Sequence, residues 1–126
     1  MFVKWLNLFT MNLLTKPLVW SLPFLMGSIY HVIAVLIPGF GEPSPTWRHA
    51  LFFSVGLLMT ALAFKKRKAF KVFLFILSMQ QIYSHGSYLI EVWKLENRID
   101  YWSVITLAGF PLMMAMSSRF KENSIS

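Results

Sequence analysis

The sequence predicts an all-α integral membrane protein, built as a four-helix transmembrane bundle. Of its 126 residues, 56% are hydrophobic and only 13% are charged, which is more apolar surface than a soluble domain of this size can bury. The Lys and Arg residues gather at the ends of the apolar stretches, as they do at the cytoplasmic ends of membrane helices. This placement explains the net charge of +7 without a nucleic-acid partner.

Residues 1–16 are predicted to form an amphipathic segment that lies in the membrane interface. Lys4 and Lys16 bracket apolar residues, and Trp5 is a typical interfacial anchor. No small-x-small cleavage site follows, so a cleavable signal peptide is not expected. Pro17 and Pro23 favour a break or kink before the first spanning helix, and the alternative is that the segment extends that helix.

Four apolar stretches follow, each about 20 residues long, which is the length that crosses a bilayer. The predicted spans are about 18–37, 47–64, 72–93 and 101–118, within a transmembrane domain at 17–118. Small residues predict the faces on which the first two spans pack closely. These faces carry Gly27, His31 and Ala34 in the first span, and His49, Phe53, Gly56, Thr60 and Ala63 in the second. Pro111 predicts a kink in the fourth span.

The basic residues set the predicted topology. The segment 65–71, KKRKAFK, is expected to be a short cytoplasmic loop, with Lys65, Lys66, Arg67 and Lys68 near anionic lipid head groups. The loops at 38–46 and 94–100 are then external, and both termini, including a tail at 119–126, are cytoplasmic. The expected location is a plasma membrane or a bacterial inner membrane.

The third span is unusually polar for a membrane helix. Its polar residues form two neighbouring stripes about 100° apart on a helix. The first stripe is Ser78, Gln81, His85 and Tyr88, and the second is Gln80, Ser84, Ser87 and Glu91. Polar groups in hydrocarbon are costly unless they face protein or water, so both stripes are predicted to point into the bundle.

All three histidines fall in the outer half of their predicted spans, on faces predicted to point inward. We therefore expect a polar pocket open toward the outer face, lined by His31, Arg48, His49, Gln81, His85, Tyr88 and Glu91. A structural interpretation stands beside this one. A single intramembrane histidine often serves only as a hydrogen-bonded packing residue, and His49 beside Arg48 fits an interfacial position.

The pocket predicts a binding or accessory subunit of a membrane complex, packed against a membrane-protein partner or a second copy. His31 and His85 could be axial ligands of a haem b, and with His49 and Glu91 they could bind Zn²⁺ or Cu²⁺.

The alternative is a small enzyme that acts on a lipid or lipophilic substrate at the outer leaflet. His85 would be its general acid or base, and Glu91 or Arg48 would orient the substrate. The chain has no cysteine, nucleophile elbow, HExxH motif or phosphate loop, so the sequence names no reaction.

Overall fold

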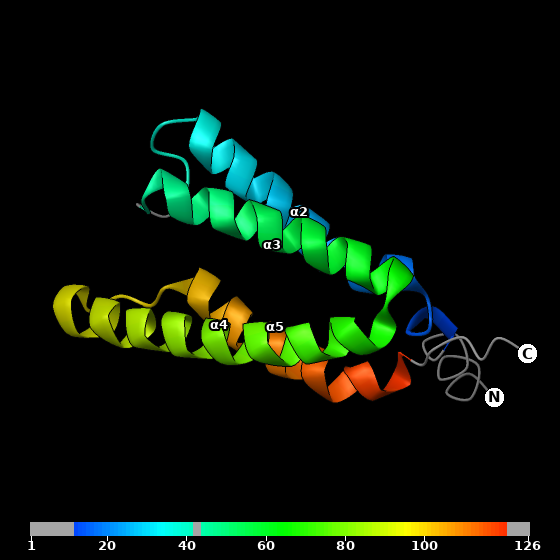
Figure 1. The fold of residues 1–126 in the computed structure, drawn as a ribbon. Coiled ribbons are helices and arrows are strands. Elements are labelled where there is room, and N and C mark those ends of the chain that lie inside the picture. Colours follow the sequence, from blue (N-terminus) through cyan, green and yellow to red (C-terminus); the bar gives the residue numbers. More distant parts are fainter. Residues whose placement is uncertain (1–11, 42–43, 121–126) are drawn as a thin grey trace, which may run out of the picture. The chain divides into compact units, whose positions relative to one another are not determined.

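The computed structural model describes residues 12–41 and 44–120, and this part of the chain is helical with no strand. Helix α2 covers Pro17–Leu36, α3 covers Thr46–Lys65, α4 covers Arg67–Glu96 and α5 covers Tyr101–Met116 (Figure 1). A short 3-10 turn, η1, covers Ser117–Arg119. The predicted all-α class is therefore confirmed. Residues 1–11 of the predicted interfacial segment lie outside the described residues.

The chain divides into two compact units. The first unit is Met1–Phe70 together with Phe120–Ser126, and it contains α2, α3 and the first residues of α4. The second unit is Lys71–Arg119, and it contains the rest of α4, α5 and η1. The first unit is therefore discontinuous in sequence, because a residue from the end of the chain completes it.

Two of the predicted spans, α2 and α3, are long and apolar enough to cross a membrane by length and composition. Each has 20 residues, and most of its apolar side chains are exposed. Among the described residues, α4 and α5 do not meet the same criterion. Helix α5 has only 16 residues, and α4 carries the two polar stripes. The structure thus supports two of the four spans directly.

The basic segment at 65–71 is helical, so the prediction of a loop there was wrong. Helix α3 runs to Lys65 and α4 begins at Arg67, which leaves Lys66 as a one-residue break with φ −144° and ψ 76°. The segment contains Lys, Arg and Ala, which favour helix, and contains neither Gly nor Pro to end one. The connection between α3 and α4 is therefore Lys66 alone.

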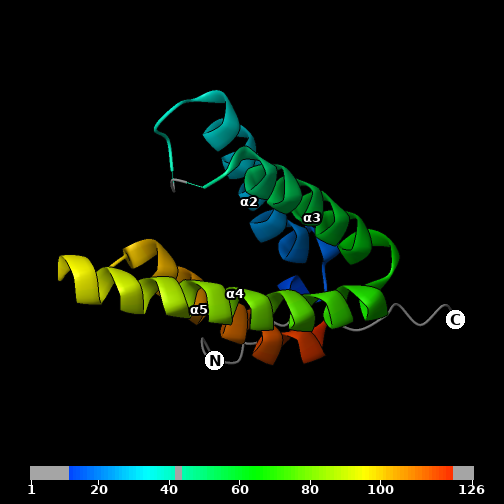
Figure 2. The same ribbon diagram turned by 60° about the vertical axis from the view of Figure 1, so that its left-hand side comes forward.

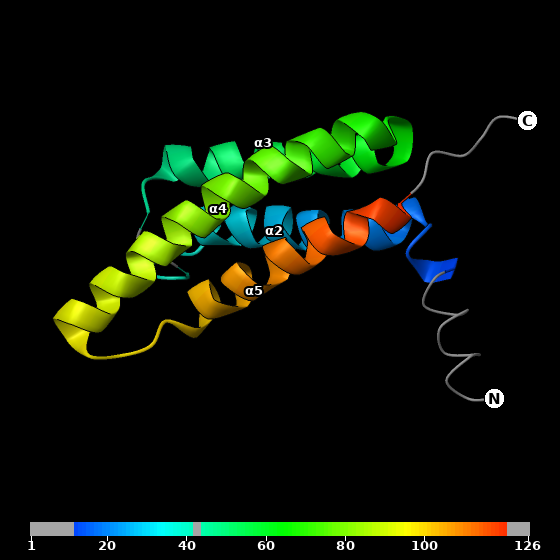
Figure 3. The ribbon, with the colours of Figure 1, turned by 90° about the horizontal axis from the view of Figure 1, so that it is seen from below.

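Helix α4 is also longer than predicted. It has 30 residues and continues to Glu96, so the loop before α5 is only 97–100. Asn97, with φ 48°, follows the helix in the left-handed conformation that often ends helices and that Asn tolerates better than most residues. Helix α5 then runs back toward the start of α4 (Figure 3).

The two prolines inside helices do not end them. Pro17 occupies the start of α2, where its missing N–H costs nothing, and the helix then continues through Pro23. Helix α5 likewise continues through Pro111. The predicted break therefore lies at the start of α2, at Lys16, which is extended.

Helices α2 and α3 lie side by side in opposite directions, in both Figure 1 and Figure 2. Their closest packing is at Ser28 and Gly56: the Ser28 hydroxyl donates to the Phe53 carbonyl oxygen at 3.1 Å. A Cβ at Gly56 would lie 2.7 Å from the Phe24 carbonyl oxygen, so only glycine fits. The predicted α3 face is confirmed for Gly56 and Ala63, which are buried. The predicted role of Gly27 was wrong, because no atom lies within 4 Å of its Cβ position.

An aromatic cluster closes the other end of the first unit. Trp20, Phe24, Phe70 and Phe120 are all buried. The Phe120 ring stacks on Trp20 with 5.4 Å between centroids and meets Phe70 edge-on at 5.5 Å. The Arg67 guanidinium lies over the Phe120 ring, 4.6 Å from its centroid. This cluster ties the beginning of α2, the beginning of α4 and residue 120 together.

Candidate functional site

The first candidate site is a histidine pair between α2 and α3. The Nδ1 atoms of His31 and His49 lie 3.0 Å apart, so one ring donates a hydrogen bond and the other accepts it. His49 is only 5% exposed, which places it inside the protein and not at an exposed interfacial position. Polar groups on two candidate membrane helices thus satisfy each other, as the low-dielectric surroundings require.

Aromatic rings surround this pair. The His31 ring stacks on Phe52 with 5.4 Å between centroids and meets Tyr30 edge-on at 5.2 Å. The Arg48 guanidinium lies 5.9 Å from the centroid of Phe52. Residues 12–41 and 44–70 contain no Asp or Glu, so the described surroundings of the pair in the first unit are cationic and aromatic.

The pair offers too few ligands for the predicted metal site. Zinc sites in proteins use three or four protein ligands. The pair supplies only two nitrogens, and these are hydrogen-bonded to each other. In the part of the chain that the structure describes, no group of three or more His, Cys, Asp or Glu residues is placed to hold a metal ion. Haem or metal binding by His31, His49 and His85 therefore gains no support.

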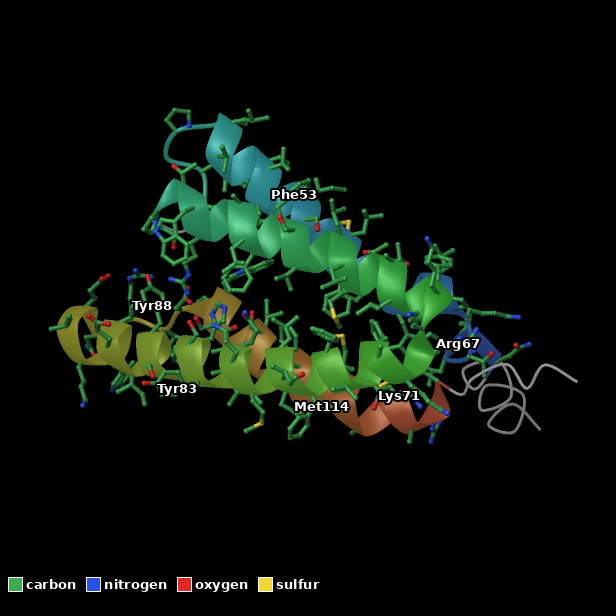
Figure 4. The ribbon with its side chains drawn as sticks, in the orientation of Figure 1. Phe53, Arg67, Lys71, Tyr83, Tyr88 and Met114 are labelled. Carbon is green, nitrogen blue, oxygen red and sulfur yellow. The ribbon has the colours of Figure 1, made fainter. Side chains whose placement is uncertain are left out.

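The second candidate site is on α4, where the two polar stripes have different environments. Ser78 and Gln81 of the first stripe are buried, and His85 and Tyr88 are half-buried. Gln80, Ser87 and Glu91 of the second stripe are exposed. The prediction that both stripes point inward is therefore correct only for the first. Figure 4 shows the half-buried Tyr88 of the first stripe and the exposed Tyr83, which belongs to neither stripe, on different sides of the helix.

Each polar stripe belongs to a longer row at alternating three- and four-residue steps. The buried seam consists of Leu74, Ser78, Gln81, His85, Tyr88 and Val92. The exposed seam is Phe73, Leu77, Gln80, Ser84, Ser87, Glu91 and Lys94, of which Leu77 and Ser84 are half-buried. Corresponding positions in the two seams are adjacent in sequence and lie about 100° apart round α4.

His85 joins α4 to α5 within the second unit. Its Nδ1 atom lies 2.9 Å from the hydroxyl oxygen of Ser103, which is fully buried. The Asp100 side chain accepts a hydrogen bond from the Ser103 backbone N–H at 3.0 Å and so caps α5. The Gly86 backbone faces Leu107 across the same contact. A histidine hydrogen-bonded to a serine is an arrangement in which the imidazole can act as a base that activates the serine hydroxyl.

One hydroxyl on the buried seam lacks a hydrogen-bond partner. Ser78 is fully buried, and its Oγ atom has no partner in the structure. Three residues on, the Gln81 side-chain amide donates to the side-chain oxygen Oε1 of Gln80 at 2.6 Å and so links the two seams. Helix α4 therefore carries polar side chains on both its buried seam and its exposed seam.

The residues predicted to line one pocket are distributed over both units. His31, Arg48 and His49 belong to the first unit, and Gln81, His85, Tyr88 and Glu91 belong to the second. The structure brings His31 and His49 together, and it leaves Glu91 exposed. At the end of α4, the exposed Glu96 carboxylate accepts a hydrogen bond from Arg98 and raises the pKa of that guanidinium.

Sequence reasoning missed Ser103 and Asp100. The pattern Asp100-x-x-Ser103 before an apolar stretch is a helix-start signal, so the cap could have been found. The contact of Ser103 with His85 spans eighteen positions and leaves no local signal.

Comparison with protein-family models, with curated proteins and with solved structures finds no match. The fold itself defines a helical protein in which two helices are long and apolar enough, by length and composition, to cross a membrane. Its function has to be argued from its own residues.

Proposed function

We propose that the protein is a four-span membrane protein with both termini on the cytoplasmic side, and that it serves as an accessory subunit of a membrane complex. Exposed apolar side chains on α4 and α5 support the two additional spans. They include Val72, Phe75, Ile76, Met79, Ile90, Ile105 and Leu112, each more than half exposed. So much exposed apolar surface on two consecutive helices suits lipid far better than water.

The distribution of charge supports the topology. Lys16 precedes α2. Lys65 ends α3, Lys66 follows it, and Arg67 and Lys68 begin α4. All five cations therefore lie at one end of the α2–α3 pair. The positive-inside rule places that end in the cytoplasm. The same cations would attract the anionic lipids of the inner leaflet. The membrane would be a plasma membrane or a bacterial inner membrane.

The observation that carries the accessory role is the exposed seam of α4. Gln80, Ser87 and Glu91 are exposed on a helix whose adjoining side chains, such as Met79 and Ile90, are apolar and exposed. In a bilayer these polar groups would face hydrocarbon at a cost unless another protein covered them. A partner helix with donors and acceptors at matching depths removes that cost.

Solubilisation in a mild detergent tests this role. The tagged full-length protein from its native membranes is expected to migrate as a complex larger than the monomer. Gln80→Leu with Ser87→Leu should release the monomer, because the helix then suits lipid without a partner. Met79→Leu is the matched control on the lipid face. A monomer in every sample, or a complex indifferent to Gln80 and Ser87, would refute the role.

A second candidate function, a small membrane enzyme, is favoured by the His85–Ser103 hydrogen bond. With the Nδ1 to Oγ distance of 2.9 Å, His85 could take the Ser103 proton as the serine oxygen attacks an acyl carbon of a lipid substrate. The protonated imidazole would then return the proton to the departing alcohol, which leaves an acyl-serine for water to hydrolyse.

Labelling with a fluorophosphonate separates this chemistry from a purely structural bond. An enzyme of this kind would form a covalent adduct at Ser103 that His85→Ala abolishes. The matched control is Ser28, which is also buried but donates to the backbone carbonyl of Phe53. An unlabelled Ser103, in vesicles or in detergent, would leave His85 and Ser103 as packing partners.

A further inference from the structure

We propose that the exposed seam of α4 is a homodimer interface, and that its occupant is the same seam of a second copy of this chain. This inference rests on the proposed accessory role, because the seam needs a protein partner only where α4 lies in lipid. It adds the identity of the partner and the register of the contact.

The spacing of the seam is that of a two-stranded helix interface. Phe73, Leu77, Gln80, Ser84, Ser87, Glu91 and Lys94 follow one another at steps of four, three, four, three, four and three residues. Such a period of 3.5 residues keeps one face of a helix against a parallel neighbour over several turns. Helix α4 is continuous through all seven positions, from Arg67 to Glu96.

The chemistry of the seam changes along the helix in a way that suits a copy of itself. Two copies inserted in the same orientation are related by a two-fold axis along the membrane normal, so equal depths meet. Phe73 and Leu77 would then pack on their own equivalents at the cytoplasmic end. Ser84 and Ser87 are small enough to let the two backbones approach closely.

Gln80 is the central polar contact. A glutamine side chain carries both a donor and an acceptor, so two glutamines across a two-fold axis satisfy each other. A partner protein of different sequence would need a matching polar residue at the same depth, whereas a second copy supplies one by symmetry. The Gln81 side-chain amide, which donates to Oε1 of Gln80, also orients that side chain.

The charges at the outer end of the seam are complementary under the same symmetry. Glu91 and Lys94 are both exposed and lie on opposite flanks of the seam. In a parallel pair, the flank of each helix that carries Glu91 faces the flank of its neighbour that carries Lys94. Glu91 meets its own equivalent at the same depth, and the neighbour's Lys94 lies less than one helical turn away on the facing flank, so the dimer carries this Glu91–Lys94 contact twice.

Disulfide cross-linking tests the interface directly, because the chain has no native cysteine. The full-length protein is purified from a foreign host, reconstituted in phosphatidylcholine vesicles and treated with a mild oxidant. Gln80→Cys, Ser84→Cys and Ser87→Cys are expected to yield disulfide dimers. Met79→Cys is the matched control, since Met79 is exposed at the same depth but about 100° round the helix.

The expected result is about tenfold more dimer at the seam positions than at Met79, with about tenfold weaker association after Gln80→Leu. Glu91→Lys or Lys94→Glu alone should weaken association, and the double exchange should restore it. Equal cross-linking at all positions, or none at the seam, would overturn the homodimer.

The same experiment separates this inference from the accessory role. If native membranes yield a complex that Gln80→Leu dissociates, while the pure protein gives no seam cross-links in vesicles, the partner is a different protein. The accessory role then stands and the homodimer is refuted. If both samples are monomeric, both proposals fail.

Discussion

His31 and His49 share a hydrogen bond between their Nδ1 atoms, 3.0 Å apart, and each belongs to a helix of 20 residues that is apolar enough to cross a membrane. The bond fixes the register of α2 against α3 near their connecting loop, while Ser28 and Gly56 fix it further along. Three predictions concern this helix pair and one concerns the aromatic cluster.

His49→Ala removes one partner of the pair. His31 is then left with a half-buried nitrogen that lacks its hydrogen bond, which costs about 1–3 kcal/mol. We expect a lower thermal unfolding temperature in detergent. It is measured by the fluorescence of a dye that reports unfolding without reacting with cysteine. Ser54→Ala is the control, since Ser54 is exposed and donates only to the Ala50 carbonyl oxygen within its own helix. Equal stability of the two variants would contradict a stabilising bond.

Gly56 and Gly27 form a matched pair of test positions. Gly56→Ala places a Cβ against Ser28 and 2.7 Å from the Phe24 carbonyl oxygen, and a backbone atom cannot move aside cheaply. The expected loss of stability is about 1–3 kcal/mol. Gly27→Ala meets no atom within 4 Å and should be neutral or slightly stabilising, because alanine favours helix. Comparable losses in both variants would show that α2 and α3 do not pack at Ser28 and Gly56.

Removal of metal should leave the protein unchanged. Two imidazoles that bond to each other are fewer ligands than a zinc site uses, so we expect no stoichiometric metal and no shift in unfolding temperature after chelation. Elemental analysis and an absorption spectrum of the purified protein, oxidised and reduced, check this. Bound zinc or copper that is absent from His31→Ala would show that the pair is a metal site after all. A Soret band would show that the protein binds haem.

Phe120→Ala tests the aromatic cluster. The fully buried ring contacts Trp20, Phe70 and Arg67, so its removal should cost about 3–5 kcal/mol and expose Trp20 to solvent or lipid. A shift in tryptophan emission together with a lower unfolding temperature is the expected result. Phe64→Ala removes a ring that is 53% exposed, and it should change stability far less.

The sequence predicted the helical class and most helix boundaries, because apolar length and turn residues are local signals. The prediction for the basic segment failed because charge was interpreted as a loop, whereas Lys, Arg and Ala form helix readily. The prediction that the second stripe of α4 points inward failed for a different reason. Periodicity groups Gln80, Ser87 and Glu91 on one face, but it does not say which neighbour, if any, covers that face.

The candidate sites were only half predictable. His31 and His49 were both expected on inward faces, yet their direct bond depends on the register of two helices, which no single helix encodes. Ser103 carried no polar neighbourhood that would single it out, and its contact with His85 is non-local. Phe120 was indistinguishable from the other phenylalanines, because its partners are about fifty and a hundred positions away.

The position of Phe120 also has a consequence for biosynthesis. Phe120 follows Phe70 by about fifty positions and Trp20 by about a hundred, so the ribosome adds it only after α4 and α5 have been made. Trp20 and Phe70 must therefore wait for their third partner until the second unit has been synthesised. A nascent chain that stalls before residue 120 would leave these two rings without that contact.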